Sequence, residues 1–142
     1  MILPDVNVLV YAHREDVPEH EVAAELLQGE LRAGRPVGLT DAVVTGFLRI
    51  VTHPRILRPA TPLAEALAFV DDLFAASNVS LLLPRSDHWP LLKALCREAD
   101  ARGNRVPDAH LAALAISWKA ELVSADRGFA RFPGLRFRPL GA

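Results

Sequence analysis

Apolar residues along this chain follow two patterns: short continuous runs, and longer stretches in which apolar positions recur at helical spacing. The short runs predict strands over residues 1–5, 36–40, 79–83 and 121–124, and residues 136–138 are a possible fifth strand. The longer stretches predict helices over residues 6–12, 19–32, 41–51, 61–76, 86–101 and 107–119. Because strands and helices alternate, we expect an α/β fold. It should be a three-layer α/β/α sandwich with a mostly parallel sheet of four to five strands.

The length of 142 residues, with no repeat, low-complexity stretch or linker, predicts one domain over residues 1–142. Cys96 is the only cysteine, so no disulfide can form within the chain, which favours a reducing compartment. No basic segment followed by an apolar one marks a signal peptide, and no apolar stretch approaches the roughly 20 residues that span a bilayer. The sequence therefore predicts a cytoplasmic protein that does not enter the membrane.

The formal net charge of −1 argues against a protein that holds nucleic acid by bulk charge alone. Among the 16 cationic residues only Lys93 and Lys119 are lysines, and the rest are arginines. The planar guanidinium fork suits phosphate. A GC-rich genome would produce the same bias, so composition leaves both explanations open.

Three aspartates, Asp5, Asp108 and Asp126, each lie at the edge of an apolar segment, where a strand and a helix meet. Taken singly, each fits a helix or turn cap. Ligand sites of parallel sheets lie at the carboxyl ends of the strands, so we expect the three side chains to converge there. Two carboxylates about 5 Å apart repel by roughly 3 kcal/mol at an effective dielectric constant near 20. A hard divalent cation, Mg²⁺ or Mn²⁺, would remove that repulsion and suit phosphodiester hydrolysis.

Four segments, in the right order over nearly the whole chain, are similar to segments of PIN-domain nucleases. Their opening motif resembles residues 5–12 (DVNVLVYA), and the helix with their third acid resembles residues 107–115 (PDAHLAALA). Their last acidic segment resembles residues 122–129 (LVSADRGF), and a stretch typical of VapC-type toxins resembles residues 46–55 (GFLRIVTHPR).

This resemblance implies a PIN-like fold and a Mg²⁺-dependent endoribonuclease that acts as the toxin of a type II toxin–antitoxin pair, with Mn²⁺ as a second suitable ion. By motif match, Asp5, Asp108 and Asp126 would be the catalytic residues and the metal ligands. Asn7 and Ser124 would orient the carboxylates or water, as partners of metal ligands generally do.

The resemblance also implies three partners: a cognate antitoxin, an RNA substrate and a second copy of the chain in a homodimer. Helices near residues 22–31 and 61–76 would form the antitoxin groove and part of the dimer contact. Amphipathic helices most often pack on their own sheet, so the sequence alone supports only two such helices. Arg49, Arg55 and Arg127 are candidates for contacts with RNA phosphates, and solvated surface arginines fit the same positions.

One position departs from the family pattern. A glutamate is expected just before the residues Phe47-Leu48-Arg49, and Gly46 stands there. The nearest acid, Asp41, lies five residues earlier, which rotates it by about 140° around a helix. We expect Asp41 to cap that helix and the three-acid site to be active.

Two alternatives remain open. The first is a PIN-like binding module whose depleted site has lost catalysis. The second is an aspartyl-phosphate phosphatase with Asp5 as nucleophile. Such enzymes usually have an acid two residues later, where this chain has Asn7.

Overall fold

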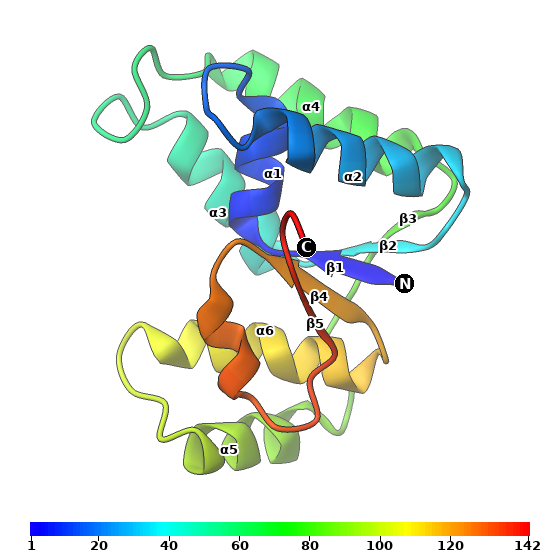
Figure 1. Cartoon of the computed structure of the whole chain (residues 1–142), viewed down its shortest axis with the longest axis vertical. Helices are drawn as coiled ribbons and strands as arrows, with labels where there is room; N and C mark the ends of the chain where they lie inside the picture. The colour runs from blue at the N-terminus through cyan, green and yellow to red at the C-terminus, as the bar shows by residue number, and fades with distance from the viewer.

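A single sheet of five short parallel strands lies at the centre of the computed structural model, which describes residues 1–142 (Figure 1). The spatial order is β3-β2-β1-β4-β5, and every neighbouring pair is parallel. The strands are β1 (Ile2–Pro4), β2 (Val37–Leu39), β3 (Val79–Leu81), β4 (Glu121–Ser124) and β5 (Phe137–Pro139). The parallel α/β sheet expected from the sequence is confirmed.

The strand order reverses at β1. The chain builds β1, β2 and β3 outward in one direction, then crosses over and adds β4 and β5 on the other side of β1. Such a reversal leaves a crevice outside the carboxyl ends of the strands on either side of it, where ligands of open parallel sheets bind. In this chain those strands are β1 and β4.

Six helices cover the two faces of the sheet (Figure 1). Four lie together on one face: α1 (Val6–His13), α2 (His20–Arg32), α3 (Asp41–Val51) and α4 (Leu63–Ala75). On the other face lie α5 (His88–Glu98) and α6 (Arg105–Ser117), which pack against each other. A short 3₁₀ helix, η1 (Arg127–Arg131), follows β4. No helix has the length and apolar character needed to cross a membrane.

The core consists of the apolar strand residues and the helix faces that cover them. Leu3 and Leu122 from the central strands, with Phe47 of α3 and Leu114 of α6, are almost completely buried. Interiors of this kind pack at near-crystalline density and move little. The loops at the carboxyl ends of β1 and β4 are therefore anchored on a rigid base.

Candidate active site

The structure brings all three aspartates to the carboxyl edge of the sheet. Asp5 directly follows β1, and Asp126 lies two residues after the end of β4. These two strands are neighbours, and the backbone N–H of Asp5 donates to the carbonyl of Val123 at 2.9 Å. Asp108 lies in the first turn of α6, which follows α5, so the expectation that it lies between a strand and a helix is wrong. The three acids thus meet at the switch point of the sheet. We call this region the carboxyl edge.

Asp5 is held by hydrogen bonds from three directions. The Ser124 hydroxyl donates to Oδ2 of Asp5 at 2.7 Å, and the Asn7 amide donates to the same oxygen at 3.3 Å. The backbone N–H of Val6 donates to Oδ1 at 2.7 Å. Asp5 is therefore the N-cap of α1 as well as part of the acidic site, so the cap and the site are compatible roles.

Asn7 and Ser124 connect Asp5 to the turn that carries Asp126. Asn7 donates to Oγ of Ser124 at 3.1 Å and accepts from the backbone N–H of Ala125 at 3.1 Å. Oγ of Ser124 accepts from the backbone N–H of Asp126 at 3.0 Å, and Ser124 is completely buried. The two residues expected to orient the acids thus contact the acidic site directly.

The electrostatics of the site oppose ionisation. Burial is the main cause that raises the pKa of Asp5 above its ordinary value, although hydrogen bonds from Ser124 and the backbone act the other way. The charges of Asp108 and Asp126 raise it further. Burial also raises the pKa of Asp108, against the opposing effect of its hydrogen bond from Arg105. The ionised acids therefore cost free energy that a bound cation would offset.

Arg105 is the residue that the sequence reasoning missed. Its Nη1 lies 3.1 Å from Oδ2 of Asp108 and 3.4 Å from Oδ2 of Asp126, so one guanidinium contacts two of the three acids. Part of this was visible in the sequence, because residues three apart on a helix share a face. The helix, however, begins at Arg105 rather than at the expected Pro107, which left Arg105 in a presumed loop.

The chemistry of the donor set suits a hard divalent cation, because three carboxylates and a hydroxyl offer oxygen atoms only. The present arrangement, however, is not a closed metal cage. No group of three or more Asp, Glu, His or Cys side chains lies at the spacing of a metal site. The cation that two of the carboxylates contact is the guanidinium of Arg105. The residues thus fit Mg²⁺ or Mn²⁺ in kind and charge, and their positions fit a larger organic cation.

The position of the missing glutamate, Gly46, packs against the start of α1. A Cβ atom at Gly46 would lie 2.8 Å from Cγ2 of Val6, closer than real contacts allow, so a larger side chain there would require Val6 or the local backbone to shift. Asp41 is exposed in the first turn of α3 and is not its cap. The cap is Thr40, whose hydroxyl accepts from the N–H of Val43 at 3.2 Å. The expectation that Asp41 caps this helix is therefore wrong.

The three arginines expected to meet phosphate are all exposed, and none forms an ion pair. Arg127 directly follows Asp126 and opens η1. Arg49 lies in the last turn of α3, and Arg55 lies in the turn that follows this helix. Only Arg127 is adjacent in sequence to one of the acids.

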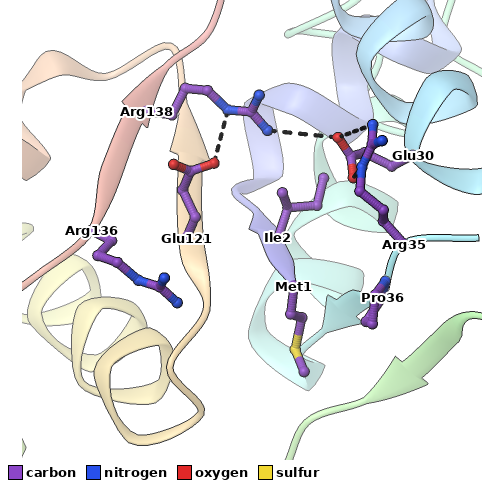
Figure 2. A pocket seen from close by; sticks show the side chains of 8 residues that line it. All are labelled: Met1, Ile2, Glu30, Arg35, Pro36, Glu121, Arg136 and Arg138. Atoms are coloured by element: carbon purple, nitrogen blue, oxygen red, sulfur yellow. Dashed lines mark hydrogen bonds and ion pairs between the residues drawn. The ribbon is translucent and has the colours of Figure 1, made fainter. Parts of the chain in front are cut away.

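A second charged region lies where β1, β2 and β4 begin, and we call it the amino edge. A pocket of about 390 Å³ opens there (Figure 2). Its charged lining residues are Glu30, Arg35, Glu121, Arg136 and Arg138. None of the three aspartates lines this pocket, so the acidic site and the amino-edge pocket are separate.

Residues 2–135 match the PIN domain family, and the chain therefore belongs to that family. The VapC ribonuclease Mb2897 of Mycobacterium bovis is 46% identical over 138 residues, which cover 97% of this chain and 94% of that protein. Ribonuclease VapC31 of Mycobacterium tuberculosis is 42% identical over 136 residues, or 96% of each chain. Within the PIN-domain proteins the chain is thus a member of the VapC group.

Two solved structures share the fold. VapBC2 from Rickettsia felis, bound to a DNA fragment from its promoter, superposes with a TM-score of 0.71 over 98% of each chain at 18% identity. FitAB bound to a DNA fragment gives a TM-score of 0.71 over 98% of this chain and 94% of that chain at 17% identity. At such low identity these matches support the architecture only.

Proposed function

We propose that this protein is a Mg²⁺-dependent endoribonuclease that serves as the toxin of a type II toxin–antitoxin pair. The observation that carries the proposal is the meeting of Asp5, Asp108 and Asp126 at the switch point of a parallel sheet, where a single cationic side chain contacts two of them. Excess carboxylate charge in a partly buried site favours a divalent cation.

Each residue of the site has a definite task in this proposal. Asp5, Asp108 and Asp126 would hold Mg²⁺ or Mn²⁺, and Asn7 and Ser124 would keep the carboxylate of Asp5 aimed at the ion. A bound divalent ion supplies an activated water and neutralises charge on a phosphodiester. The hydroxyl of buried Ser124 donates to Oδ2 of Asp5 at 2.7 Å, which restricts the orientation of this carboxylate.

RNA is the proposed substrate because the curated relatives are named ribonucleases and because exposed arginines lie on the helix ends and turns of the same chain. Arg127, next to Asp126, is the first candidate for a phosphate contact. Arg49 and Arg55 would contact phosphates further along the strand. With a net charge of −1, binding has to rely on such local cations rather than on bulk charge.

The proposed protein partners are an antitoxin and a second copy of the chain. Helix α4 exposes Leu63, Leu67 and Phe74, whose exposed fractions are 60%, 44% and 38%. Spacings of four and eleven residues place these side chains on one helix face. Contiguous exposed apolar surface is typical of protein interfaces. Light scattering of the purified protein at increasing concentration tests the dimer, and Leu67→Glu should lower the measured mass.

The decisive experiment is cleavage of a structured RNA by purified protein with Mg²⁺, with and without EDTA. We expect EDTA, Asp5→Asn and Asp108→Asn each to lower the rate by at least about a hundredfold, since each disrupts the metal site. Asp100→Asn is the matched control, because Asp100 is exposed and pairs only with Arg102. Cleavage that survives both site substitutions would contradict the proposal.

The second candidate function is a binding module without catalysis, and the packing at Gly46 favours it. Gly46 stands where the glutamate is expected and packs closely against Val6, so these segments supply three acids to the site. Calorimetry separates the two candidates. Heat of Mg²⁺ or Mn²⁺ binding that disappears in Asp5→Asn supports the enzyme, whereas no binding at millimolar metal supports the module.

A further inference from the structure

Arg105 occupies an unusual place in this site. A single nitrogen, Nη1, contacts Oδ2 of Asp108 at 3.1 Å and Oδ2 of Asp126 at 3.4 Å. The two acids come from different segments, the first turn of α6 and the turn after β4. Arg105 is the one cationic side chain that bridges these segments, so it already does what a bridging cation would do.

Neighbouring residues leave space for this guanidinium between the two aspartates. Arg105 is the first residue of α6 and lies one turn from Asp108, on the same helix face. On the other side is Gly128, whose N–H donates to Oδ1 of Asp126 at 2.8 Å. A Cβ atom at Gly128 would collide with Nη1 of Arg105 and lie 2.9 Å from Oδ1 of Asp126. Glycine therefore leaves the space that the guanidinium fills.

The site is nevertheless exposed enough for the Arg105 side chain to move away from the two aspartates. The exposed fractions of the side chains are 35% for Arg105, 25% for Asp108 and 44% for Asp126. Ion pairs at such exposure are weak, because water screens them and the long side chain loses entropy when it is held. A divalent ion bound directly to carboxylate oxygens at about 2.1 Å can therefore compete with the guanidinium.

We propose that Arg105 is an internal counter-ion that holds Asp108 and Asp126 when no metal is bound, and that it leaves them when a divalent cation binds. This inference rests on the proposed metal site. It explains why the three acids lie near one another although they are not at the spacing of metal ligands. In the metal-free protein their positions are set by a guanidinium, which is larger than Mg²⁺.

Competition for the same oxygens has a measurable consequence. Neutralising Arg105 removes a positive charge a few ångströms from the ion, and Coulomb's law at an effective dielectric constant of about 20 predicts a large gain in metal affinity. Solvent exposure reduces this gain. We expect Arg105→Gln to bind Mg²⁺ at least about tenfold more tightly than the wild type.

The test is isothermal titration calorimetry with Mg²⁺, and separately with Mn²⁺, on the wild type, Arg105→Gln and Arg102→Gln. Arg102 is the matched control, because it lies three residues away and pairs with exposed Asp100 at 3.1 Å. Tighter binding by Arg105→Gln alone supports the inference. Equal or weaker binding by Arg105→Gln overturns it and leaves the metal site intact. Absence of binding in all three proteins overturns the metal site itself, and the inference with it.

A second measurement needs no variant and covers the case in which Arg105→Gln fails to fold. The side-chain Nε–H signals of arginines can be followed by NMR during a Mg²⁺ titration of the wild-type protein. We expect the Arg105 signal to move in step with metal saturation while that of Arg102 stays in place. An Arg105 signal that does not change at saturating Mg²⁺ would overturn the inference.

Discussion

Acidic side chains at the two edges of the sheet differ in how far neighbouring cationic groups neutralise them. At the amino edge, buried Glu30 receives two bonds from Arg35, at 2.8 and 3.0 Å (Figure 2). Arg138 lies 3.1 Å from Glu121 and 3.9 Å from Glu30. Here the cations match or exceed the acids in number. At the carboxyl edge there are three aspartates, and one guanidinium contacts two of them.

The pKa values follow this difference. The hydrogen bond from Arg35 is the main reason why the pKa of Glu30 lies below its ordinary value, against the effect of burial. Burial raises the pKa values of Asp5 and Asp108, and neighbouring acids add to the rise. The amino edge is therefore neutralised by the fold itself. The carboxyl edge leaves a charge imbalance, as functional sites often do.

The largest expected effect is the stabilisation of the carboxyl edge by metal. Saturating Mg²⁺, at about 100 times its dissociation constant, should stabilise the fold by roughly 2.7 kcal/mol. Because the folded-state pKa values of Asp5 and Asp108 are raised, their protonated forms stabilise the metal-free fold at low pH. That contribution is lost as the pH rises through those pKa values. Mg²⁺ binds the ionised forms, so its effect should grow with pH.

Thermal unfolding with and without Mg²⁺, from about pH 4 to pH 7, measures this dependence. We expect the Mg²⁺-induced increase in Tm to keep growing at pH values above those expected for aspartates with the ordinary pKa of 3.8. Asp5→Asn should reduce both the shift and its pH dependence. A shift of equal size at every pH would contradict the proposed role of these two acids.

The next effect concerns the hydroxyl of Ser124, which donates to Asp5 and accepts from Asn7 and from the backbone of Asp126. Ser124→Ala should lower Mg²⁺ affinity by about tenfold to a hundredfold, the usual result when a partner of a metal ligand is lost. Calorimetry measures it. Ser117→Ala is the control, because this buried hydroxyl donates to Asp87 at 2.6 Å at the other end of α6. Equal metal affinity in both variants would sink this prediction.

At the amino edge we expect a loss of stability without a loss of function. Glu30→Gln removes the charge that Arg35 contacts and should cost about 1 to 2 kcal/mol at pH 7, with RNA cleavage and Mg²⁺ affinity unchanged. Because the folded-state pKa of Glu30 is lowered, its contribution is present above the ordinary value of 4.5 and lost as the pH falls through the folded-state pKa.

Chemical denaturation at several pH values checks this, with exposed Glu25→Gln on the same helix as the control. The difference between Glu30→Gln and the wild type should disappear in acid. A difference that persists below about pH 3 would show that the side chain matters through packing rather than charge.

The smallest expected effect is that of Arg136→Ala, which should change the rate of RNA cleavage less than about twofold, because Arg136 lines the amino-edge pocket and not the acidic site. Arg127→Ala should instead weaken RNA binding and lower the slope of log affinity against log salt by about 1. A cleavage assay checks Arg136→Ala, and filter binding at several salt concentrations checks Arg127→Ala. A tenfold loss of cleavage rate in Arg136→Ala would mean that RNA reaches the amino edge. The functional contrast between the two edges would then fail.

The local features of the fold could be predicted from the sequence. Strands and helices lie where the apolar pattern predicted them, with shifts of a few residues at their ends, such as the start of α6 at Arg105. Asp5, Asp108 and Asp126 could be picked out as candidates because an acid at the edge of an apolar segment is visible in the chain itself. These features depend on near neighbours in sequence, where apolar spacing and caps determine structure.

Only the tertiary structure decided which distant segments meet. The sequence did not show that β4 pairs with β1, which brings Asp126 to Asp5, or that Arg105 reaches Asp126 as well as Asp108. It marked Gly46 as the place of a missing acid, and the fold showed that Val6 fills the space beside it. Such contacts depend on the packing of the whole core, which no local pattern encodes. The sequence thus determined the acids, and the fold determined the guanidinium between two of them.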